Sequence, residues 1–111
     1  VQLNDVEIFT VSSVVYISLT RGLRQLQLLH EALNQGAASF DEPFPYHPHV
    51  TLAQQISPNQ VPGVFDHASR RWAEFSHQRS FLVDHAVLIQ ATRFNTWSDV
   101  GVHHLARRPA R

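Results

Sequence analysis

The chain has 111 residues, a formal net charge of zero and an apolar content normal for a globular protein. This length predicts one domain with a modest hydrophobic core. Zero net charge argues against a general attraction to nucleic acid or to an anionic membrane surface. The absence of cysteine excludes disulfides, thiolate nucleophiles and cysteine-ligated zinc, and it suits the reducing cytosol, so we expect a cytoplasmic protein. No apolar run approaches the roughly 20 residues of a membrane span, and we expect no membrane partner.

Two strands and a helix are predicted in the first third of the chain. The strands cover residues 2–9 and 13–19, and the second is rich in β-branched residues and almost continuously apolar, as in a strand that is strongly covered. Thr20 is the predicted N-cap of the helix, a leucine stripe at helical spacing follows it, and Gly36 supplies the C-terminal stop. His30 lies in this helix, where we expect an ordinary surface histidine.

A proline-containing loop, a short strand and a second helix are predicted next. Residues 37–48 contain three prolines, which exclude an interior helix or strand. The strand covers residues 49–54, and residues 57–63 read as the start of a helix because proline is tolerated in a first helical turn. The apolar stripe of this second helix is formed by Val64, Phe65, Ala68, Trp72 and Phe75.

The last two strands are predicted over residues 81–90 and 97–105. The order β-β-α-β-α-β-β indicates an α+β fold with a mostly antiparallel sheet and two helices. We expect a single domain over residues 1–106, and a solvated basic tail over residues 107–111.

The short third strand carries the candidate chemistry. Because side chains alternate along a strand, Val50 and Leu52 are predicted to face the core, whereas His49 and Thr51 face the other way, roughly 7 Å apart. Histidine exchanges protons near neutral pH, and a threonine hydroxyl can hydrogen-bond a phosphate oxygen. A His-x-Thr pair is also commonplace on amphipathic strands, so the spacing alone does not establish a site.

A metal site is the alternative that the spacing leaves open. His47 shares the face of His49 if the strand extends back that far, and a His-x-His pair is a known ligand arrangement for zinc. Such a pair needs a third ligand, which Thr51, Gln54 and Gln55 do not supply. We therefore expect no metal and no cofactor.

The segment Tyr46-His47-Pro48-His49-Val50-Thr51-Leu52-Ala53 resembles the Pro-His-hydrophobic-Thr-Leu-Ala motif of the two-histidine phosphoesterase superfamily, most closely the second such motif of its 2′-5′ RNA ligase-like branch. The surroundings also follow the family's order, from the apolar strand and the leucine-rich helix to the segment Phe81–Leu88. The resemblance implies two His-x-Thr/Ser motifs in two pseudo-symmetric lobes. Members of the family open 2′,3′-cyclic phosphates or join 2′-5′ linkages in RNA or nucleotides without a metal.

The resemblance also implies roles for single residues. His49 would be a general acid or base, Thr51 would hold the phosphate, and His47 and Gln54 would lie beside the substrate. Gln54 departs from the basic residue that many members have there, and Arg21, Arg24 or Arg93 are candidates to replace that charge.

Only one motif is found in the sequence, so the chain resembles a C-terminal lobe. The expected partners are a nucleotide or RNA end as substrate, and either a second lobe or a second copy of the chain in a homodimer. The alternative is a non-catalytic nucleotide- or RNA-binding domain that retains a single motif.

Overall fold

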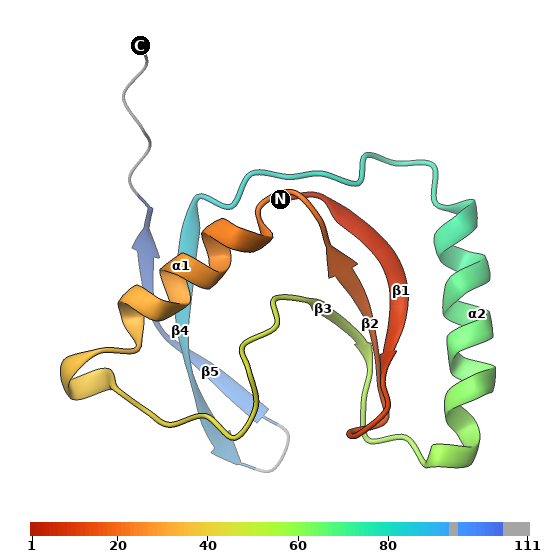
Figure 1. Ribbon diagram of the computed structural model, residues 1–111, viewed down its shortest axis with the longest axis horizontal. Coiled ribbons are helices and arrows are strands. Elements are labelled where there is room, and N and C mark those ends of the chain that lie inside the picture. Colours follow the sequence, from red (N-terminus) through yellow and green to blue (C-terminus); the bar gives the residue numbers. More distant parts are fainter. Residues whose placement is uncertain (94–95, 106–111) are drawn as a thin grey trace. The chain divides into compact units, whose positions relative to one another are not determined.

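A computed structural model describes residues 1–93 and 96–105 of the chain. Five strands, two α-helices and two short 3₁₀ helices follow one another along it (Figure 1). Their bounds are β1 Leu3–Phe9, β2 Val14–Leu19, α1 Leu23–Leu33, η1 Gly36–Ala38, β3 Val50–Ala53, η2 Pro58–Gln60, α2 Val61–Glu74, β4 His85–Arg93 and β5 Thr96–His104. The predicted α+β class and the order β-β-α-β-α-β-β are confirmed.

The chain forms two compact units, Val1–Phe81 and Leu82–Arg111, each with its own antiparallel sheet. The first unit contains the sheet β1-β2-β3, and the second contains the pair β4-β5. The single domain over residues 1–106 stays a prediction, and the basic tail at 107–111 lies outside the described residues. No helix in the described part of the chain is long and apolar enough to cross a membrane.

The core of the first unit lies between its sheet and α2. Val6 of β1 is paired with Ile17 of β2, both are buried, and Val15 is completely buried beside them. Full burial of an aliphatic side chain stabilises a fold by about 1.5–3 kcal/mol, which is why this continuously apolar strand lies in the centre of the sheet. Figure 1 shows α2 running alongside β1 and β2. It covers the core with Val61, Val64, Phe65, Ala68 and Trp72.

The N-cap of α1 lies two residues later than the N-cap predicted at Thr20. The observed N-cap is Gly22, whose φ of 91° lies in the left-handed region that favours glycine. A Cβ at this position would lie 2.9 Å from Cγ2 of Val1, so the close approach of the N-terminus also requires glycine. The Thr20 prediction is therefore wrong. The C-terminal stop predicted at Gly36 is also wrong, because α1 is capped by Asn34, and Gly36, with a φ of 60°, is the first residue of η1.

The second unit is a β-hairpin. Its register pairs His85 with His104 and Leu88 with Gly101, and it shifts by one residue just after that pair. Within this chain every residue of β5 is exposed, and Ala86 alone in β4 is partly covered. Several of the exposed side chains are large and apolar, namely Val87, Leu88, Ile89, Trp97, Val100 and Val102.

Candidate functional site

The predicted site residues lie at and just before β3, at one edge of the three-stranded sheet. Thr51 is opposite Tyr16 of β2, whose neighbours in sequence point into the core beneath α2. Because side chains alternate along a strand, Tyr16 and Thr51 share the face that α2 does not cover. Pro48 is buried next to the exposed His49, and its ring restricts the backbone that leads into β3.

Two aromatic rings of β1 and β2 form a floor beneath the histidines. The rings of Phe9 and Tyr16 are stacked with centroids 3.9 Å apart, and we call this pair the aromatic floor. His47 and His49 each lie 5.1 Å from Phe9 and nearly perpendicular to it. Their centroids lie 5.5 and 5.3 Å from Tyr16, respectively. The structure therefore brings His47, His49 and Thr51 to the same part of the sheet, although β3 itself starts only at Val50.

A backbone contact fixes which nitrogen of His49 can transfer a proton. Nδ1 of His49 is hydrogen-bonded to the carbonyl oxygen of His47. A carbonyl oxygen only accepts hydrogen bonds, so Nδ1 must carry the hydrogen and donate it. The other ring nitrogen, Nε2, then carries the free lone pair of the neutral ring and is the one that can accept a proton. The same bond orients the ring.

The prediction that Val50 and Leu52 face the core is wrong. Val50 is 39% exposed and Leu52 is 46% exposed, whereas Ala53 packs against the core. Val50 is opposite Ile17 of β2 in regular register but stays exposed at the edge of the sheet. For Leu52 the cause is a register irregularity between β2 and β3, where Tyr16 is opposite Thr51 but Val15 is opposite Ala53. Leu52 is the extra residue of this irregularity, and it breaks the simple alternation that the sequence suggested.

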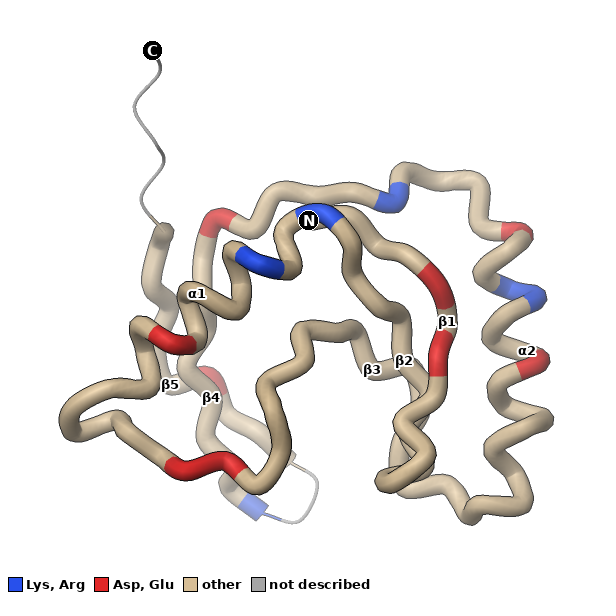
Figure 2. The backbone as a smooth tube through the Cα atoms, viewed as in Figure 1, with Lys and Arg blue, Asp and Glu red and all other residues tan. Residues whose placement is uncertain are grey.

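The basic residues expected near the phosphate lie outside β2 and β3. Gln54 is exposed directly after β3 and just before Gln55, whose φ of 57° turns the chain away from the strand. Arg21 is exposed before α1, and Arg24 lies 4.0 Å from Glu31 on the same helix. Arg93, the last residue of β4, belongs to the other unit. Figure 2 shows acidic and basic positions interspersed, with β2 and β3 carrying neither lysine nor arginine.

The burial of Tyr16 affects its ionisation. Burial, with a smaller contribution from the Glu7 carboxylate, raises the pKa of Tyr16 from its usual 10.0. The phenol, already neutral at physiological pH, therefore stays protonated further into the alkaline range. Among the residues that the structure describes, no group of three histidine, cysteine or acidic side chains is placed to hold a metal ion.

The aromatic floor was not predicted from the sequence, and His30 was expected to be an ordinary surface histidine. Tyr16 could have been found from its place in β2, because it alternates with two residues that face the core. Phe9 ends β1 and its position depends on the pairing of β1 with β2, which the sequence did not specify. His30 contacts Glu42 and Tyr46, and neither contact is apparent from helical periodicity.

Comparison with models of known protein families identifies a match over most of the chain. The family model described as the 2′-5′ RNA ligase superfamily matches residues 1–93, which include the whole first unit and β4. No curated protein sequence is similar enough to this chain to count as a match. The match covers His47, His49, Thr51 and the strands that position them.

Proposed function

Because the chain belongs to the 2′-5′ RNA ligase superfamily, we propose that it supplies one His-x-Thr half of a two-histidine phosphoesterase site. Its substrates are 2′,3′-cyclic phosphates or 2′-5′ linkages in RNA or nucleotides, as in a cyclic phosphodiesterase. The observation that carries the proposal is the hydrogen bond from Nδ1 of His49 to the His47 carbonyl, which leaves Nε2 free to exchange a proton with a substrate.

In this proposal His49 and Thr51 have separate tasks. Of the two histidines of the complete site, the neutral one accepts a proton at a ring nitrogen from the attacking water or hydroxyl, and the protonated one donates a proton to the leaving oxygen. His49 takes one of these two roles through Nε2, and the histidine of the other lobe takes the other. Each such transfer typically contributes about 10² to 10⁴ in rate. The Thr51 hydroxyl donates to a non-bridging phosphate oxygen and holds the phosphorus in place. The complementary histidine comes from a second lobe or from a second copy of the chain.

The test is hydrolysis of 2′,3′-cyclic nucleotides by the chain, with its oligomeric state measured in the same samples by light scattering. The variant is His49→Ala, and the matched control is His67→Ala, because His67 is an exposed histidine of α2. We expect His49→Ala to lower kcat by about 10² or more and His67→Ala to leave it unchanged. Turnover that increases with the fraction of dimer in the sample indicates that two copies complete the site. Turnover that survives in His49→Ala contradicts the proposal.

A non-catalytic nucleotide-binding domain is the second candidate function. It is favoured by the presence of a single motif, which leaves the site without its second histidine. Calorimetry with the same 2′,3′-cyclic nucleotide separates the two functions. The alternative is supported if the nucleotide binds, His49→Ala weakens that binding, and no turnover occurs at any protein concentration or when a second lobe is added.

A further inference from the structure

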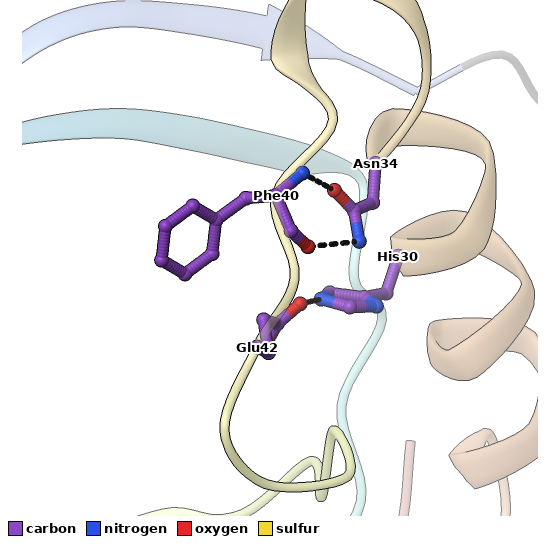
Figure 3. Close-up of polar contacts among 4 residues, drawn as sticks. All are labelled: His30, Asn34, Phe40 and Glu42. Carbon is purple, nitrogen blue, oxygen red and sulfur yellow. Dashed lines mark hydrogen bonds and ion pairs between the residues drawn. The ribbon is translucent and has the colours of Figure 1, made fainter.

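Two side chains at the C-terminal end of α1, one in its last turns and one at its C-cap, contact the irregular segment that leads to the motif. Asn34 bonds twice to the backbone of Phe40, where its Oδ1 accepts the amide N–H at 2.6 Å and its Nδ2 donates to the carbonyl at 3.0 Å (Figure 3). His30, one helical turn earlier, forms an ion-pair contact through Nε2 with the Glu42 carboxylate (Figure 3). The C-terminal half of α1 therefore contacts residues 40 and 42 through side chains only.

His30 also makes a contact closer to the motif. Its ring is stacked on Tyr46 with centroids 4.0 Å apart and an angle of 8° between the planes. The side chains of His30 and Glu42 are 29% and 34% exposed, so the contact is partly screened from water. Partial burial and, to a smaller extent, the Glu42 carboxylate raise the pKa of Tyr46, as expected for a phenol held beside that acid.

Few other restraints act on this segment. Residues 39–49 contain no helix or strand, so no ladder of backbone hydrogen bonds fixes their path. Tyr46 directly precedes His47, and the buried Pro48 limits the rotation between His47 and His49. The carbonyl that orients His49 belongs to His47. A displacement of Tyr46 is thus transmitted over one residue to the acceptor that sets the orientation of the His49 ring.

We propose that His30 is a positioning residue for His49, which acts by holding Tyr46 and Glu42 against α1. It does not touch the reacting phosphate. This inference rests on the proposed function for its effect on rate, but its structural content is independent of any activity. A misplacement of about 1 Å at a reacting group can cost up to 10² in rate, so loss of the contact is expected to lower kcat.

The experiment combines kinetics with NMR on the full chain. The imidazole resonances of His49 and the backbone amide of Val50 are recorded for wild type and His30→Ala, alongside kcat and KM on a 2′,3′-cyclic nucleotide. The matched control is Gln25→Ala, an exposed position of the same helix. We expect His30→Ala to shift the His49 and Val50 resonances and to lower kcat about 10-fold with KM nearly unchanged. Gln25→Ala should do neither.

Two further variants separate the contacts of His30. His30→Phe keeps the stack on Tyr46 and loses the bond to Glu42, whereas His30→Gln keeps a donor and loses the stack. Each should give a smaller resonance shift than His30→Ala. If His30→Ala does not fold, these two variants test the positioning role in its place. Unchanged His49 and Val50 resonances in the folded variants overturn the proposal. Absence of turnover in a wild-type dimer contradicts completion of the site by a second copy and leaves the positioning role standing, because the resonance shifts still test that role.

Discussion

Replacing Tyr16 with alanine removes half of the aromatic floor beneath the candidate histidines. Tyr16 is 5% exposed, so the substitution exposes or empties almost the whole volume of a ring in the centre of the sheet. Truncating a buried aromatic side chain to alanine costs about 3–5 kcal/mol. Loss of the stacked pair with Phe9 adds about 0.5–1.5 kcal/mol. The sum is a large part of the roughly 5–15 kcal/mol that stabilises an ordinary domain.

The assay is denaturation by guanidinium, followed by circular dichroism. Tyr16→Ala should lower the free energy of unfolding by about 4 kcal/mol. Tyr16→Phe is the control, because it keeps the ring against Phe9, His47 and His49 and should cost less than about 1 kcal/mol. If Tyr16→Ala costs less than about 1 kcal/mol, Tyr16 does not pack as described, and the aromatic floor cannot be what supports the histidines.

Three further predictions test other contacts of the first unit. Gly22→Ala should lower the free energy of unfolding by about 2 kcal/mol, seen by thermal melting, because of the positive φ and the clash with Val1; an unchanged melting temperature would contradict this. Arg79→Ala should cost about 1–3 kcal/mol in the same assay, because Arg79 Nη2 donates to two carbonyls at the end of α2. The pKa values of Tyr16 and Tyr46 are raised above 10.0, so the stability they contribute is present below pH 10 and should decline as the pH rises through the folded-state values. Phenolate absorbance and urea midpoints measure this, and a midpoint that rises above pH 10 would refute it.

The regular elements could be predicted because their signals are local. The continuous apolar run of β2 predicted a covered strand, and Val15 is indeed completely buried. The proline-rich loop and the proline-tolerant start of α2 were also correct, because proline restricts the backbone in any context. The N-cap at Gly22 was missed because the requirement for glycine depends on Val1, which approaches from β1 and not from the helix.

The candidate site could be predicted only as far as the strand alternation held. His49 and Thr51 were chosen from their spacing and from the resemblance of the motif, and their roles stay a prediction. The exposure of Leu52 was missed because a register irregularity depends on how β3 pairs with β2. The four residues of β3 do not by themselves specify that pairing. The contacts of His30 were missed for a similar reason, since its partners lie more than ten residues away and outside its own helix.

The position of β3 at the edge of its sheet has a consequence for ligand binding. In the described part of the chain β3 has four residues, and its only neighbouring strand is β2. Detachment of β3 from β2 should therefore require less free energy than global unfolding. We expect the amides of Val50 and Thr51 to exchange with deuterium faster than that of Val15. A phosphate held by Thr51 would then slow this exchange, and part of the binding energy would be spent on keeping the strand docked.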